Sequence, residues 1–278
     1  MKALQLTESG EDTIIFATIN KPTPGEDEVL VRLKAAALNH RDQWCREGKY
    51  PGLKTGTTLG SDGAGIVEEV GDNVDEMWLG KEVVINPNIA WGDNPAVQSS
   101  DYHILGMPTD GTFAEYVKVK SDRLVGKPGH LSFEETAALP IGGMTAYRAL
   151  FTQAKVQQGD RVLVTGIGGG VSQFAALFLK ASGISYYVTS GSDEKIAEAI
   201  KAGAEGGFNY KSEGWAKQAI KESGQFDVII DSAGGDLVNT YLKLIKPAGR
   251  IVFYGSTAGT PKSLDLFRIF WSQTSLLG

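Results

Sequence analysis

Cysteine is almost missing from this chain of 278 residues, because Cys45 is the only one. A single cysteine excludes an intramolecular disulfide and any zinc site built from several thiolates. No run rich in lysine and arginine occurs, and 27 basic against 33 acidic residues give a net charge of −6. This mildly acidic balance argues against binding to nucleic acid or to an anionic membrane.

Long apolar runs are also missing. No stretch approaches the ~18 apolar residues that cross a membrane, and residues 1–7 contain no apolar segment of the signal-peptide kind. We therefore expect a cytoplasmic protein with a reduced cysteine. Its hydrophobic content of 42% is ordinary for a globular core, and its length predicts about two domains.

The first part of the chain reads as short strands separated by turns. Strand-like segments occupy residues 29–35, 60–67, 81–86 and 112–119, and glycine or proline marks the bends between them. Residues 87–110 carry Pro, Gly, Asn and Asp without a clear period, which predicts a long loop. Because helical stretches are few, we expect residues 1–123 to form a β-rich barrel or sandwich.

After residue 124 the pattern changes to an alternation of strands and helices. Strand-like segments at 161–165, 185–189, 227–231 and 250–254 alternate with segments that start at Val171 and Asp193 or cover 215–221 and 235–245. Such alternation is typical of βαβ units on a parallel sheet. We therefore predict an α/β, doubly wound second domain over residues 124–278, with residues 275–278 as its last strand.

The most specific signal is a glycine turn between a buried strand and a helix. Gly166, Gly168, Gly169 and Gly170 precede Val171, at which the helix opens. Glycines let the backbone approach a pyrophosphate, and the N–H groups of the helix N-terminus meet its charge. A tight structural turn is the alternative. The strand before it and the helix after it favour dinucleotide binding.

The end of the second strand bears on the choice of dinucleotide. An acid is expected there for NAD, but Ser190 occupies the position and leaves room for a 2′-phosphate. Lys195 is placed to neutralise this phosphate, and Tyr210 is placed to donate a hydroxyl. The alternative is that Ser192 only caps the helix and that Lys195 is a solvated charge. We predict NADP(H), with Ser192 in the cofactor site.

Several ordered motifs support a resemblance over nearly the whole chain. It rests on residues 38–42, 59–65, 110–116 and 143–146, on the glycine turn, and on residues 191–195 with 209–210. These motifs resemble the medium-chain dehydrogenase/reductase superfamily, in its zinc-free, quinone-oxidoreductase-like branch. The resemblance implies an N-terminal GroES-like domain, a Rossmann domain and a homodimer formed through sheet edges. Relatives continue beyond residue 278, so we expect this chain to lack a segment that returns to the first domain.

The resemblance also bears on metal binding. Zinc-dependent relatives hold their metal at positions that correspond to Asn39, Ser61 and Ile141, none of which supplies a thiolate or an imidazole. His40 and His103 are expected to be ordinary loop histidines. We therefore expect no metal. Ser172 replaces the usual last glycine of the turn, and we expect it to loosen the packing of helix on strand.

Zinc-free relatives transfer a hydride from NADPH to quinones or to conjugated enones. The resemblance implies that Asn39 hydrogen-bonds the acceptor oxygen and names Tyr50 as a candidate proton donor. It also implies that Asp42 and Asp62 are structural. The cofactor residues that it adds are Thr145, Gly191, Tyr254, Gly255 and Ser256. Two alternatives stay open, namely alcohol dehydrogenase chemistry on aldehydes or ketones and a non-catalytic NADPH-binding sensor or interaction protein.

Overall fold

The computed structural model describes residues 1–7 and 13–278 and divides into two compact units, Met1–Ile141 and Gly142–Gly278. The change in sequence pattern placed the boundary earlier, after residue 123. Residues 124–141 group with the first unit because helix α2 (Phe133–Ala137) packs on strands β3 (Glu28–Ala37) and β4 (Asp62–Val70).

The first unit is built on a five-stranded antiparallel sheet. Its order is β8 (Tyr116–Lys120), β3, β4, β5 (Glu82–Ile85) and β9 (Leu124–Gly126). Strands β1 (Lys2–Leu6) and β2 (Ile14–Thr18) form a separate antiparallel pair. Alternate residues of β3, β5 and β8 enter one core, whose members include Val29, Val31, Val83, Ile85, Val117 and Val119. The predicted β-rich first part is confirmed.

Close backbone contact explains one of the many glycines in this unit. A Cβ on Gly65 would lie 2.2 Å from the Arg32 carbonyl oxygen of the neighbouring strand. Real atoms do not approach so closely, so only glycine lets β3 and β4 pair here.

Short elements that the sequence pattern did not indicate connect these strands. They are α1 (His40–Arg46), the 3₁₀ turns η1 (Glu76–Trp78) and η2 (Ser121–Arg123), and α2. The predicted loop over residues 87–110 is mostly irregular, but it contains the paired two-residue strands β6 (Asn88–Ile89) and β7 (His103–Ile104). These elements have two to seven residues, too few for hydrophobic periodicity to reveal them.

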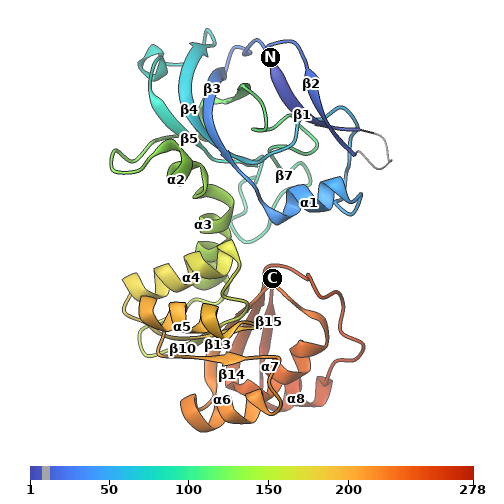
Figure 1. The fold of residues 1–278 in the computed structure, drawn as a ribbon, viewed down its shortest axis with the longest axis vertical. Helices are drawn as coiled ribbons and strands as arrows, with labels where there is room; N and C mark the ends of the chain where they lie inside the picture. Colours follow the sequence, from blue (N-terminus) through green and yellow to red (C-terminus); the bar gives the residue numbers. More distant parts are fainter. Residues whose placement is uncertain (8–12) are drawn as a thin grey trace. The chain divides into compact units, whose positions relative to one another are not determined.

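The second unit contains a six-stranded parallel sheet (Figure 1). Its order is β12 (Gly206–Asn209), β11 (Ser185–Ser190), β10 (Arg161–Val164), β13 (Phe226–Asp231), β14 (Ile245–Phe253) and β15 (Ser275–Leu277). The order reverses between β10 and β13, and such a switch point is where ligands bind in open α/β sheets. The predicted doubly wound sheet is confirmed, including its last strand.

Helices cover both faces of this sheet. Helices α4 (Gly170–Ala181) and α5 (Asp193–Ala202) lie on one face, and α6 (Trp215–Ser223) and α7 (Val238–Leu244) lie on the other (Figure 1). The strands serve both layers, because Val162 and Val164 pack with α4 whereas Leu163 packs with α6 and α7. This two-sided burial explains the continuous apolar runs.

The remaining helical elements add to these layers, because Leu150 joins the core under α4 and Ile269 packs against the core under α6 and α7. Helix α3 (Pro140–Tyr147) runs into a π-helical turn, η3 (Arg148–Gln153). A short 3₁₀ turn, η4 (Gly235–Leu237), precedes α7, and α8 (Leu266–Trp271) precedes β15. Among the described residues, no helix is both long enough and apolar enough to cross a membrane.

Candidate active site and dinucleotide site

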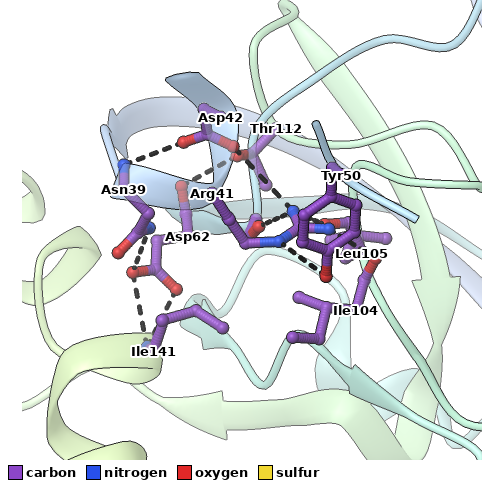
Figure 2. A network of polar contacts seen from close by, with 10 residues as sticks. Asn39, Arg41, Asp42, Tyr50, Asp62, Ile104, Leu105, Thr112 and Ile141 are labelled. Carbon is purple, nitrogen blue, oxygen red and sulfur yellow. Dashed lines mark hydrogen bonds and ion pairs between the residues drawn. The ribbon is translucent and has the colours of Figure 1, made fainter. Parts of the chain in front are cut away.

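The first unit gathers a buried polar network around the carboxyl group of Asp62 (Figure 2). The Asn39 side-chain amide donates to Asp62 Oδ2 at 2.9 Å, and the Ile141 backbone N–H donates to Asp62 Oδ1 at 3.1 Å. The Thr112 hydroxyl donates to the Asp62 backbone carbonyl at 2.8 Å. Side-chain and backbone atoms of Asp62 together therefore bind three other segments that are far apart in the sequence.

Burial changes the acidity of this carboxyl. Asp62 is 1% exposed, and loss of solvent raises its pKa to about 7. The hydrogen bonds from Asn39 and Ile141 work in the opposite direction, while the charge of Asp42 adds to the rise. Asp62 thus changes charge near neutral pH.

Helix α1 holds the Asn39 end of the network. The Asn39 N–H donates to Asp42 Oδ2 at 2.8 Å, and the Asp42 N–H donates back to the Asn39 carbonyl at 3.0 Å. This reciprocal pair fixes the first turn of α1. Asp42 and Asp62 both bind backbone N–H groups, which agrees with the structural role expected for them.

A buried cation lies beside this network. Arg41 is 6% exposed, and its guanidinium donates to the Ser61 hydroxyl and, at 3.0 Å, to the Leu105 carbonyl. The guanidinium also lies 4.6 Å from the centre of the Tyr50 ring, and its Nε donates to the Tyr50 hydroxyl at 3.4 Å (Figure 2). Arg41 was not among the sequence-predicted site residues, since its burial is a tertiary property.

The glycine turn of the second unit has the shape expected for an anion site. Strand β10 ends at Val164, Gly166 adopts a φ of +61°, and α4 begins at Gly170 with Gly169 as its uncapped N-cap. The first N–H groups of a helix have no intrahelical acceptor. Glycine at the N-cap leaves these donors open to a phosphate, so the turn and Val171 fit a dinucleotide diphosphate.

Ser172 links the two ends of the turn, a role that the expected loosening of helix on strand did not include. Its hydroxyl lies 2.7 Å from the Gly166 carbonyl oxygen and 2.8 Å from the Gly169 carbonyl oxygen, and the residue is fully buried. One hydroxyl proton is therefore shared between the two ends of the turn. The serine hydroxyl thus adds hydrogen bonds that a glycine at this position would lack.

The residues expected at the 2′-phosphate end gather after β11. Ser190 ends this strand, Ser192 caps α5, and the Lys195 N–H donates to the Ser192 hydroxyl at 3.4 Å. A Cβ on Gly191 would meet Tyr210 Oη at 2.9 Å and Lys211 Cε at 2.7 Å. Lys211 was missed from sequence, although it directly follows Tyr210.

The nearby acid, Asp193, is already engaged in a hydrogen bond. Its carboxylate accepts from the Asn209 side-chain amide at 2.8 Å. In the part of the chain that the structure describes, neither Lys195 nor Lys211 forms an ion pair. The side chains around the end of β11 thus include two lysines without an ion pair among the described residues, beside a carboxylate bound to an amide.

A second buried carboxylate supports the sheet edge beside the turn. Asp231, at the end of β13, accepts from the Thr165 hydroxyl at 2.5 Å and from the Gly234 N–H at 2.7 Å. The Tyr241 phenol also bonds to it; burial, reinforced by the charge of Asp231, raises the pKa of that phenol. In the sequence, Asp231 is visible only as an acidic residue at the end of an apolar strand, which does not reveal this role.

The other predicted cofactor residues are divided between two places. Tyr254, Gly255 and Ser256 follow β14 at the same edge of the sheet, and burial raises the pKa of the Tyr254 phenol, whereas the Ser232 and Ser172 hydroxyls lower it. Thr145 lies on α3, outside the sheet. The structure thus brings the predicted cofactor residues, apart from Thr145, to the carboxyl ends of four parallel strands.

Comparison with known proteins identifies the family. A model of the alcohol dehydrogenase GroES-like domain matches residues 25–129, and a model described as zinc-binding dehydrogenase matches residues 170–278. A zinc-type alcohol dehydrogenase-like protein, YogA, of Leptosphaeria maculans is 41% identical over 257 residues, which cover 87% of this chain and 72% of that protein. The chain belongs to the medium-chain dehydrogenase/reductase superfamily.

Other members of this superfamily show the same likeness. A quinone oxidoreductase of Pseudomonas aeruginosa is 29% identical over 259 residues, which cover 92% of this chain and 74% of that protein. The crystal structure of an NAD-dependent alcohol dehydrogenase matches with a TM-score of 0.94 at 36% identity and covers 100% of this chain and 84% of the other. The GroES-like and Rossmann folds and an oxidoreductase that binds a nicotinamide dinucleotide are thereby confirmed.

The residues present do not fit the zinc that the family description implies. Asn39 and Ile141 both bind Asp62, and Ser61 accepts from a guanidinium that already carries a positive charge. Zinc takes nitrogen, sulfur or carboxylate ligands in sets of three or four. No group of three or more His, Cys, Asp or Glu side chains that could hold a metal occurs within residues 1–7 and 13–278.

We predict that Asp62→Asn changes how stability depends on pH. A folded-state pKa near 7, above the usual value near 4, means that the folded protein binds more protons than the unfolded chain between these two pH values. The wild-type free energy of unfolding therefore falls as pH rises from 4 to 7, and Asp62→Asn removes this loss. Between these pH values, the free energy of unfolding of the variant relative to that of wild type therefore rises by at most roughly 4 kcal/mol.

The measurement is urea unfolding at pH values from 4 to 8. The exposed Asp72→Asn is the control for loss of one carboxylate and keeps the wild-type pH dependence. Parallel pH profiles for wild type and Asp62→Asn would contradict a raised pKa of the buried Asp62 carboxyl group.

Proposed function

We propose that this chain reduces quinones or α,β-unsaturated carbonyl compounds with NADPH and without zinc. The observation that carries the proposal is the contact of the Arg41 guanidinium with Ser61, beside the bond from Asn39 to Asp62. Hydrogen-bonded side chains there take the place of a metal centre. Quinones and enones suit such a site, because the negative charge that develops in them is delocalised and needs less electrophilic help.

Asn39 is the proposed electrophile. Its amide carries two N–H bonds, of which one donates to Asp62. The other N–H is then held in a defined direction and donates to the oxygen of the acceptor as negative charge develops there. NADPH, when bound, supplies the hydride.

Tyr50 is the proposed proton donor. Its oxygen accepts a hydrogen bond from Arg41 Nε, so its own proton remains for donation. The proton passes from the phenol to the acceptor oxygen, and the phenolate left behind is stabilised by the adjacent guanidinium until solvent reprotonates it. Tyr50 is half-buried, which is compatible with contact to a ligand.

The preference for NADPH rests on the surroundings of Ser190. Ser190 is small, and Lys195, Tyr210 and Lys211 supply two ammonium groups and a phenol nearby. A 2′-phosphate binds well to such donors. The carboxylate that would favour NAD is missing from the strand end, since Asp193 lies in the helix and binds Asn209.

Alcohol dehydrogenase activity on aldehydes or ketones is the second candidate. It is favoured by the descriptions of two similar proteins, a zinc-type alcohol dehydrogenase-like protein and an NAD-dependent alcohol dehydrogenase. The donor set around Asn39 argues against the zinc-dependent form of this reaction.

The two candidates differ in turnover and in metal content. We expect purified protein to consume NADPH with a panel of quinones and enones and to contain no stoichiometric zinc. Absorbance at the reduced-nicotinamide band follows turnover, and elemental analysis measures the metal. Stoichiometric zinc with alcohol oxidation would favour the dehydrogenase, and tight NADPH binding without turnover of any acceptor would favour a sensor.

We predict that Ser190→Asp shifts the cofactor preference. The new carboxylate repels the 2′-phosphate but accepts from a ribose hydroxyl, so the NADPH-to-NADH affinity ratio falls by about ten-fold or more. Fluorescence titration with each dinucleotide measures the two dissociation constants. Ser100→Asp, which adds the same charge to an exposed loop of the first unit, serves as the control. An unchanged ratio in Ser190→Asp would refute the 2′-phosphate assignment.

We also propose that two copies of the chain associate through the β15 edge. Strand β15 is an edge strand of the six-stranded sheet, and edge strands present unpaired backbone groups. Helix α8, which precedes it, exposes four large apolar side chains: Leu266, Phe267, Phe270 and Trp271. An apolar cluster beside a free edge is typical of an association surface.

Phe270→Glu tests this association. We expect the variant to sediment as a monomer, because a charge at the centre of the apolar cluster must lose its hydration in the interface. Leu177→Glu is the matched control, since Leu177 and Phe270 are both 58% exposed. A monomeric wild-type chain, or a Phe270→Glu dimer of unchanged strength, would contradict the proposal.

A further inference from the structure

Gly168 is a glycine of the turn whose backbone does not require glycine. Gly166 adopts a positive φ, but the φ of Gly168 lies outside the left-handed range. Any residue can adopt such a backbone, so the reason for glycine must lie in the surrounding space.

The space beside Gly168 is taken by the Lys195 side chain. A Cβ built on Gly168 would lie 2.9 Å from Lys195 Nζ, 3.1 Å from its Cδ and 3.5 Å from its Cε. Lys195 thus runs across the turn and places its ammonium group directly against the Gly168 backbone. A Cβ on Gly170, two residues further along, would have no atom within 4 Å, so the close contact at Gly168 is not shared by every glycine of the turn.

The position of this ammonium is electrostatically unusual. Lys195 lies in the first turn of α5, where the helix dipole favours negative charge. Glu198 lines the same cavity of about 480 Å³ between α4 and α5, but it forms no ion pair with Lys195 within the described residues. A cation held against a dipole and without a carboxylate partner is suited to an anionic ligand.

We propose that Gly168 is a specificity-determining position that acts through Lys195. The missing side chain lets the lysine lie across the turn, which holds its ammonium where a 2′-phosphate is bound. This inference rests on the proposed preference for NADPH. It adds that the preference depends on a residue of the diphosphate turn as well as on the end of β11.

Gly168→Ala is a mild test, because only the mobile end of a lysine must move to admit the methyl group. We expect the NADPH-to-NADH affinity ratio to fall by about three- to ten-fold, since a charge-assisted hydrogen bond is weakened. Lys195→Met lowers the ratio by about ten-fold or more. In the Lys195→Met background, Gly168→Ala then has no further effect on the ratio.

The ratio separates this effect from a direct clash with the diphosphate. A clash weakens NADH and NADPH equally and persists in the double variant, and that result would overturn the inference. Gly170→Ala is the control in the same turn and leaves the ratio unchanged. Fluorescence titration gives the dissociation constants, and thermal melting verifies that each variant is folded.

The outcomes also distinguish this inference from the proposed function. A wild-type protein without preference for NADPH contradicts the proposed cofactor and the inference together. A wild-type preference that Lys195→Met lowers and Gly168→Ala leaves unchanged overturns the role of Gly168 alone.

Discussion

The hydrogen bonds made by the buried Asp62 carboxyl group organise the candidate active site of the first unit. Asn39, at the start of α1, and Ile141, at the end of this unit, both donate to it. Without these donors the carboxyl would be buried and unsatisfied, at a cost of several kcal/mol by the usual range of about 2–7. The same bonds orient the Asn39 amide, so the stability of the network and the chemistry proposed for it have one origin.

In the neighbouring Arg41 network, a buried cation is likewise stabilised by hydrogen-bond partners. A buried guanidinium must have acceptors, and the Ser61 hydroxyl and the Leu105 carbonyl supply them. This requirement makes Ser61 part of a structural contact. Asn39, Ser61 and Ile141 are thus each hydrogen-bonded to a neighbouring ionisable side chain.

In the second unit, hydrogen bonds from buried polar side chains likewise fix the backbone at the carboxyl edge of the sheet. Ser172 shares its proton between two carbonyls of the glycine turn, and Asp231 gathers three donors beneath the neighbouring strand end. These contacts fix the backbone, while glycines at 168 and 191 leave room for the lysine side chains. Rigid backbone and adaptable cations together suit a ligand that carries several phosphates.

Much of this arrangement could be predicted from the amino-acid sequence. The apolar runs ending at Val164 and Asp231 establish buried parallel strands, and the glycines after Val164 establish a turn open to phosphate, because periodicity and backbone freedom are local properties. The tertiary structure alone decided that burial raises the pKa of Asp62 and that Arg41 donates to Ser61. It also decided that the Ser172 hydroxyl links the ends of the turn and that the Lys195 side chain lies against Gly168. Each of these depends on atoms brought together from distant segments, and neither periodicity nor composition encodes such distances.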